Sequence, residues 1–175
     1  MQALAAECNM EEARTLFSES QRLYHNIGNV VDVGNNVVSV LLNEYKNRAE
    51  AFGVDFSFSV SIPPELPISA VDYYIILGNT LDNAIEGALS VPEGQRTITL
   101  QLKQHQHTLF YKLENTCSQS HAWRKRDKNH GYGLHNVKKC IEKYSGNMTT
   151  SVQNGKFIFM ARLTCAMDSF TSSAK

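Results

Sequence analysis

The chain has 175 residues, of which 42% are hydrophobic and 19% are charged, enough for one ordinary hydrophobic core. Basic and acidic residues balance at 17 each, so the net charge gives no indication of a nucleic acid or a membrane surface as a partner. The four cysteines lack any metal-ligand spacing, which is typical of a reducing compartment. The sequence as given contains neither a signal peptide nor an apolar run long enough to cross a bilayer.

The first 52 residues are predicted to be helical. Asn9, followed three residues later by Glu12, has the capping-box pattern of a helix start. Apolar residues recur at helical spacing before and after an Asn- and Gly-rich stretch at 26–36, which is expected to bend or break the helix, and Gly53 is expected to end it. Two helices joined by a tight turn bury little apolar surface alone, so we expect this region to pack against a partner subunit.

A different apolar period begins at residue 54, where hydrophobic and polar residues alternate up to residue 62, as in a half-buried strand. Similar patterns predict strands at 96–104, 108–114, 148–152 and 157–163, the last two joined by the hairpin sequence Asn154-Gly155. Helices are predicted at 69–90 and 137–144, with a loop at 116–130 and a frayed tail after residue 164. This order predicts an α/β two-layer sandwich, with helices on one face of a mixed, mostly antiparallel sheet.

Two asparagines mark the first candidate site, in the stretch LGNTLDNAIEGAL at 77–89. The predicted helix has one broad apolar face, which comprises Val71, Tyr74, Gly78, Leu81, Ile85, Ala88 and Leu89. Asn79 and Asn83 lie on a narrow polar stripe with Asp72 and Glu86. A solvated helix face is the simpler interpretation of this stripe. However, solvated faces usually carry Lys, Glu and Gln, which favour the helix more, whereas an asparagine oxygen suits Mg²⁺ held jointly with phosphates.

Two further features lie close together in the sequence. Gly131 and Gly133, in the stretch HGYGLHNVKKCIEKYSG at 130–146, precede a predicted helix, where backbone N–H groups can approach a phosphate. A lone pair of glycines is more often a plain turn, but its place between a loop and an amphipathic helix favours the phosphate. The loop before it is either a solvated basic loop or a lid whose cations reach phosphates; these cations are Arg124, Lys125, Arg126 and Lys128.

These motifs resemble those of a known family. The stretch NTLDNAIEGA resembles the N-box of the GHKL ATPases, and HGYGLHNVKKCIEKYSG resembles their G2 box. Over residues 8–164 the chain is similar to the ATP-binding domain of sensor histidine kinases. The segments NMEEA, VLLNEYKNRAEAFGV and ENT are similar to the branch of Gram-positive peptide-pheromone and regulatory sensors. The resemblance implies a Bergerat-type ATP-binding fold.

The resemblance also implies roles for single residues. Asn83 matches the asparagine that binds Mg²⁺, and Asn79 matches the N-box asparagine that faces the phosphates of ATP or ADP. The remaining matches to the G2 box are Gly131, Gly133, Leu134 and Asn136.

One motif of the family is missing. The usual Asp-x-Gly of the G1 box, which binds the adenine amino group, is absent, and Asn115 in ENT is its best positional substitute. An asparagine oxygen can accept the same hydrogen bond, though without charge assistance.

The implied reaction is transfer of the ATP γ-phosphoryl group to a histidine, and from there to an aspartate of a response regulator. No histidine here has the sequence context of a phospho-acceptor, and the NMEEA match places the acceptor upstream of this chain, so this fragment is not expected to phosphorylate itself. Residues 1–52 would be part of the dimerisation and phosphotransfer helices, 53–165 the catalytic domain and 166–175 a tail. The implied protein is a homodimeric membrane sensor with this region in the cytoplasm, attached to the membrane only through an upstream segment.

Two other functions compete with this interpretation. Hydrolytic GHKL ATPases have a glutamate general base where Asn79 stands, and asparagine cannot take a proton from water; Glu86, on the same stripe, is the residue that could supply one instead. A degenerate, anti-sigma-like module that binds nucleotide to switch a protein partner would fit the missing G1 aspartate and acceptor histidine. A purely structural protein would leave the N-box and G2 box as coincidence.

Overall fold

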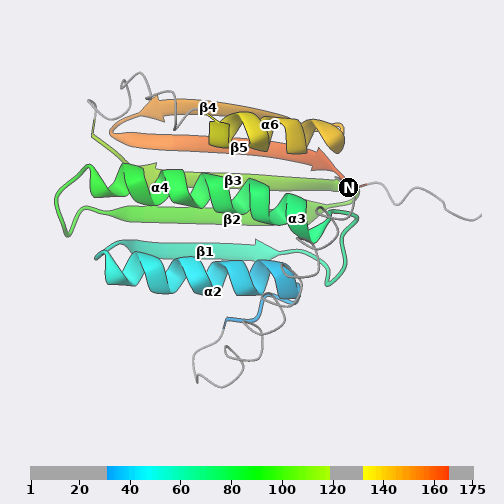
Figure 1. Ribbon diagram of the computed structural model, residues 1–175, viewed down its shortest axis with the longest axis horizontal. Coiled ribbons are helices and arrows are strands. Elements are labelled where there is room, and N and C mark those ends of the chain that lie inside the picture. Colours follow the sequence, from blue (N-terminus) through cyan, green and yellow to red (C-terminus); the bar gives the residue numbers. More distant parts are fainter. Residues whose placement is uncertain (1–30, 119–131, 166–175) are drawn as a thin grey trace, which may run out of the picture. The chain divides into compact units, whose positions relative to one another are not determined.

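The computed structural model describes residues 31–118 and 132–165 (Figure 1). By its contacts the chain divides into two compact units, Met1–Asp32 and Val33–Lys175. Several predicted features lie outside the described residues: the helix start at Asn9, most of the loop at 116–130, and the tail after residue 165.

A five-stranded sheet forms one layer of the second unit. Its strands are β1 (Asp55–Ser61), β2 (Thr97–His105), β3 (Thr108–Thr116), β4 (Asn147–Gln153) and β5 (Lys156–Thr164), in the spatial order β1-β2-β3-β5-β4. Only β1 and β2 pair in parallel, and the other neighbours are antiparallel. The second hairpin turns at Asn154 and Gly155, whose φ angles are 51° and 71°, as the Asn-Gly sequence predicted. The mixed, mostly antiparallel sheet is therefore confirmed.

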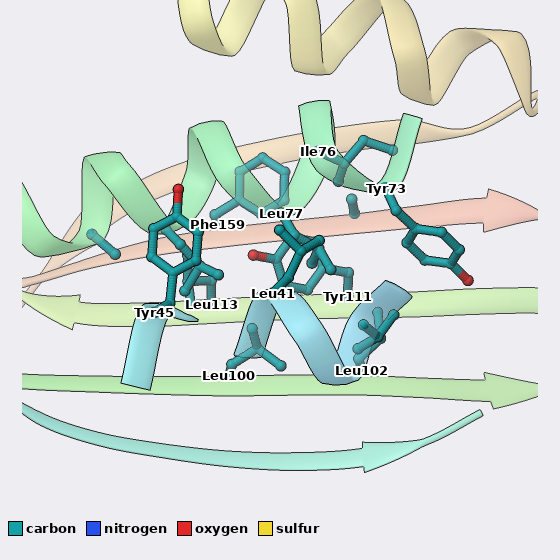
Figure 2. Close-up of a cluster of buried hydrophobic side chains, with 14 of the residues drawn as sticks. Leu41, Tyr45, Tyr73, Ile76, Leu77, Leu100, Leu102, Tyr111, Leu113 and Phe159 are labelled. Atoms are coloured by element: carbon teal, nitrogen blue, oxygen red, sulfur yellow. The ribbon is translucent and has the colours of Figure 1, made fainter. Parts of the chain in front are cut away.

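Helices form the second layer, on one face of this sheet (Figure 1). They are α2 (Asn36–Ala51), α3 (Ala70–Tyr73), a π-helical turn η1 (Tyr74–Gly78), α4 (Asn79–Leu89) and α6 (Tyr132–Lys143). The core lies between the two layers; Figure 2 shows Leu41, Leu77, Leu100, Tyr111 and Phe159 gathered there. No helix among the described residues is long and apolar enough to cross a membrane.

The position of α2 differs from the expectation. Asn35 caps this helix, because its side-chain oxygen accepts a hydrogen bond from the Val38 N–H at 3.1 Å, and Gly53 follows its end with φ of 64°. The apolar side of α2 packs into the core beneath it, where Leu42 and Ala49 are fully buried. Helix α2 thus covers the sheet of its own unit, and the unit begins twenty residues before the predicted boundary at residue 53.

The predicted helix at 69–90 contains the π-helical turn, which was not expected. A π-turn inserts one extra residue per turn, so the apolar face before it is rotated relative to the face after it. Val71 and Tyr74, predicted to be on the buried face, are therefore 56% and 53% exposed. Asp72, predicted to be on the polar stripe, is instead buried.

Candidate functional site

Asn79 and Asn83 present their side-chain oxygens in the same way. The Nδ2 of Asn79 donates to the Ile75 carbonyl at 2.7 Å, and the Nδ2 of Asn83 donates to the Asn79 carbonyl at 2.6 Å. No described residue donates a hydrogen bond to either Oδ1. Both amides are therefore fixed by their nitrogen, and two acceptor oxygens, one helical turn apart, remain available to a ligand.

The core fixes the turn from which these asparagines project. Tyr45 donates its hydroxyl hydrogen to the Gly78 carbonyl at 3.1 Å, and Thr80 donates to the Ile76 carbonyl at 2.7 Å. The Thr80 oxygen in turn lies 2.6 Å from the buried hydroxyl of Tyr111 on β3. Burial raises the pKa of Tyr111, so this hydroxyl stays protonated and can donate. Side chains from α2 and the sheet thus satisfy the π-turn, a structure that is frequent at functional sites.

A cavity of about 510 Å³ lies beside the asparagines. Helix α4 supplies most of its wall, α2 supplies another part, and α6 supplies one residue. The lining residues are Arg48, Phe52, Asn79, Asp82, Asn83, Ile85, Glu86, Leu89 and Gly133. The polar stripe of α4 therefore faces a cavity of a size typical for small-molecule ligands.

The first turn of α6 comes close to Asn79 at Gly133. A Cβ atom at residue 133 would lie 3.0 Å from the Asn79 Oδ1, so a glycine there lets the two helices approach. The helix begins at Tyr132, earlier than predicted, because the 132–136 stretch lacks the apolar period that would reveal it. Gly133 is consequently inside the first turn, where backbone N–H groups have no intrahelical acceptor and can bind an anion.

The other predicted site residues are distributed differently. Leu134 is half-buried and packs against the core, whereas Asn136 is exposed. Five predicted residues lie outside the described part of the chain: Arg124, Lys125, Arg126, Lys128 and Gly131.

Asn115 is buried at the end of β3, where only 2% of it is exposed. Its Nδ2 donates to the Thr116 carbonyl at 2.9 Å, but its Oδ1 accepts no hydrogen bond from any described residue. The side chain lies against Gly87 of α4, since a Cβ atom on Gly87 would overlap the Asn115 Nδ2. Asn115 does not line the cavity. A buried acceptor without a partner is costly, which fits an oxygen that a ligand satisfies.

The charges on the cavity wall come from residues that the motif analysis did not single out for this purpose. Arg48 of α2 forms an ion pair with Asp82 of α4, with 2.7 Å between Nη1 and Oδ1, and Glu86 lines the same wall. Arg48 and Phe52 lie four residues apart on α2, but no sequence motif marks them. Only the packing of α2 beside α4 assigns them to the site.

A polar cluster ties α6 to the start of α3. The Asp72 carboxylate accepts hydrogen bonds from Lys143 at 2.9 Å and Tyr144 at 2.7 Å, as well as from Ser69 and Cys140. Burial of the carboxyl disfavours its charge, but these hydrogen bonds more than offset burial and lower its pKa to about 2. The carboxylate fixes the far end of the helix whose first turn meets Asn79.

Within residues 31–118 and 132–165, no group of three or more His, Cys, Asp or Glu side chains could hold a metal ion. A metal in this cavity would therefore need the asparagine oxygens together with oxygens of a bound ligand. Such a mixed set of oxygen ligands suits Mg²⁺, which is usually bound by few protein groups plus phosphates and water.

Comparison with known proteins identifies relatives of this fold. A family model described as a GHKL domain matches residues 68–163, more than half of the chain. The catalytic domain of histidine kinase ThkA is 16% identical over 74% of this chain and 92% of its own, with a TM-score of 0.61. The mycobacterial sensor histidine kinase MprB is 18% identical over 73% of this chain and 93% of its own, with a TM-score of 0.56.

The Acinetobacter baumannii histidine kinase AdeS is similar over a longer part, 94% of this chain and 83% of its own, at 16% identity and a TM-score of 0.56. At such identities the likeness to these structures shows a shared fold. No curated protein matches this chain.

Proposed function

Because this chain belongs to the GHKL domain family, we propose that it is the ATP-binding catalytic domain of a two-component sensor histidine kinase. The observation that carries this proposal is the cavity in which the unpaired oxygens of Asn79 and Asn83 face the first turn of α6 at Gly133. That arrangement offers oxygen ligands for a cation and amide donors for an anion in one place, which is what a nucleotide with a divalent metal requires.

Each part of the site has a task in this proposal. Asn83 holds Mg²⁺, Asn79 faces the phosphates, and the N–H groups around Gly131 and Gly133 bind phosphate oxygens. When bound, Mg²⁺ neutralises part of the phosphate charge. The basic residues of the loop at 124–128 complete the site over the phosphates. The unpaired Oδ1 of Asn115 accepts a hydrogen bond from the adenine amino group, in place of the missing aspartate.

The proposed reaction breaks the bond between the γ-phosphorus of ATP and its bridging oxygen, and forms a bond from that phosphorus to a histidine nitrogen. ADP leaves, and the phosphoryl group later passes to an aspartate of a response regulator. The histidine belongs to a helix upstream of this chain, within a homodimer attached to the membrane outside it. Asn79 cannot remove a proton from water, which disfavours hydrolysis.

A second candidate function rests on Asn115. Its distance from the lining of the cavity, together with the missing G1 aspartate, favours a degenerate module in which bound nucleotide switches a protein partner without phosphoryl transfer. The two functions share the nucleotide site and differ only in the transfer step.

The test of the site is a calorimetric titration with ADP, with and without Mg²⁺, of the chain and of two variants. We expect Mg²⁺ to tighten ADP binding, and Asn83→Ala to remove about tenfold or more of that gain because the metal loses a ligand. Asn47→Ala, which alters an exposed asparagine of α2 away from the cavity, serves as the control and should change nothing. Absence of ADP binding in both conditions, or full Mg²⁺ dependence in Asn83→Ala, would refute the proposed site.

The transfer step needs the full-length protein, which contains the upstream helix. Incubation with radiolabelled ATP should yield protein-bound phosphate that is lost in acid and survives alkali, as expected for a phosphorus–nitrogen bond. A full-length protein that binds ADP with Mg²⁺ but takes up no phosphate would favour the non-catalytic module.

A further inference from the structure

The described wall of the cavity is poorly matched to a nucleotide in its charge. Three of its lining residues are charged: Arg48 is positive, whereas Asp82 and Glu86 are negative. A nucleoside di- or triphosphate is itself a polyanion, so a wall with net negative charge would repel it. Arg48 is the single cation that lines the cavity within residues 31–118 and 132–165, and it comes from α2, outside the motifs that define the site.

The position of Arg48 is defined by two contacts. Its Nη1 lies 2.7 Å from the Asp82 Oδ1, and its guanidinium carbon lies 5.3 Å from the centroid of the Tyr45 ring. Tyr45 in turn donates to the carbonyl of Gly78, directly before Asn79. Arg48 is therefore held over α4 beside the two asparagines, next to the residue that precedes Asn83 in the sequence.

The contact with Asp82 is easily exchanged for another. The side chains of Arg48 and Asp82 are 43% and 53% exposed, and an exposed ion pair of this kind contributes little to stability. A guanidinium carries five N–H donors, and it binds a phosphate through two parallel hydrogen bonds, more strongly than a neutral donor does. A phosphate that enters the cavity can thus compete with Asp82 for Arg48.

We propose that Arg48 is a phosphate ligand for the nucleotide, contributed by α2 and kept beside the empty cavity by Asp82. This inference rests on the proposed function, since it assumes that the cavity binds a nucleotide. In it, Asp82 is the resting partner of the arginine, and the phosphate chain of the nucleotide replaces it.

The experiment is a double-mutant cycle on ADP binding in the presence of Mg²⁺, with adenosine as a ligand that lacks phosphate. The four proteins are the unmodified chain, Arg48→Gln, Asp82→Asn and the double variant. We expect Arg48→Gln to weaken ADP binding about tenfold and to leave adenosine binding unchanged. Asp82→Asn should tighten ADP binding because it frees Arg48, and Arg48→Gln should weaken ADP binding in the Asp82→Asn background as well.

Two outcomes would overturn the proposal. If the double variant binds ADP as tightly as Asp82→Asn alone, Arg48 merely neutralises Asp82 and does not touch phosphate. If Arg48→Gln weakens adenosine and ADP equally, the arginine acts through packing. In contrast, a failure of the proposed function would appear in the unmodified chain, as no ADP binding at all, and is thereby distinguished from a failure of this inference.

Two further variants guard against indirect effects. Arg48→Lys keeps the charge but loses the forked geometry, so its ADP affinity should lie between those of the unmodified chain and Arg48→Gln. Arg162→Gln removes an arginine of β5 that binds Asn147 and does not line the cavity; it should leave ADP affinity unchanged. Equal losses in Arg162→Gln and Arg48→Gln would show a general effect of charge and would refute a direct contact.

Discussion

Replacement of Asp72 by asparagine is expected to destabilise the fold in a way that depends on pH. The buried carboxylate accepts hydrogen bonds from Ser69 on its own segment and from Cys140, Lys143 and Tyr144 at the end of α6. Asparagine has nearly the same shape but no charge, and its NH₂ group cannot accept a hydrogen bond. At least one of these donors therefore loses its acceptor in Asp72→Asn.

The magnitude follows from the pKa of the carboxyl group. Burial opposes its ionisation, but the hydrogen bonds more than offset burial and lower the pKa of Asp72 from 3.8 to about 2. Because the folded pKa lies below the unfolded one, the ionised group contributes its full stability above about pH 5 and loses it as the pH falls toward 2. The difference corresponds to roughly 2 kcal/mol at neutral pH and about 1 kcal/mol at pH 3.

The measurement is urea unfolding of both proteins at pH 7 and pH 3. The free energy of unfolding of Asp72→Asn should be lower by about 2 kcal/mol at pH 7, and the gap should narrow by about half at pH 3. Glu142→Gln on the same helix is the control, because its pair with Lys138 is 3.8 Å long and exposed, and such pairs contribute little. A gap that is absent at pH 7, or that has the same size at both pH values, would refute this account of Asp72.

Two other substitutions test the packing around the site. Thr80→Val removes the oxygen that lies 2.6 Å from the buried Tyr111 hydroxyl, and should lower the free energy of unfolding by about 1–3 kcal/mol; a double variant that also carries Tyr111→Phe should recover part of this loss, and a simple sum of the two losses would contradict the contact. Gly146→Ala places a Cβ atom against the Arg162 carbonyl and Ile141, and should cost about 1–3 kcal/mol in the same assay; an unchanged unfolding midpoint would show that the turn between α6 and β4 can open freely.

The strands were predictable because each one carries its own pattern. Phe56, Phe58 and Val60 alternate with polar residues, and in β1 they face the core layer while their neighbours are exposed. Asn154-Gly155 specifies its tight turn through two residues that tolerate positive φ. Local features of this kind need no knowledge of distant residues, and the sheet topology followed from them.

The helical phase at 69–90 was less predictable, since a period of 3.6 assumes a regular helix. The π-turn at Tyr74–Gly78 is stabilised by Tyr45 from α2 and, through Thr80, by Tyr111 from β3, both remote in sequence. Because of this turn, Tyr74 is exposed and Asp72 is buried, and neither could be anticipated from the segment itself.

The sequence by itself determined the two motifs with their asparagines and glycines, because residue identity and short spacing are enough to define them. The tertiary structure decided which of these residues meet: Gly133 lies against Asn79, and Asn115 lies behind Gly87, away from the cavity. It also decided that Arg48 of α2 is the cation beside Asn83. The physical reason is that a cavity is formed by side chains from separate elements, and only the packing of α2, α4 and α6 on a common sheet brings them together.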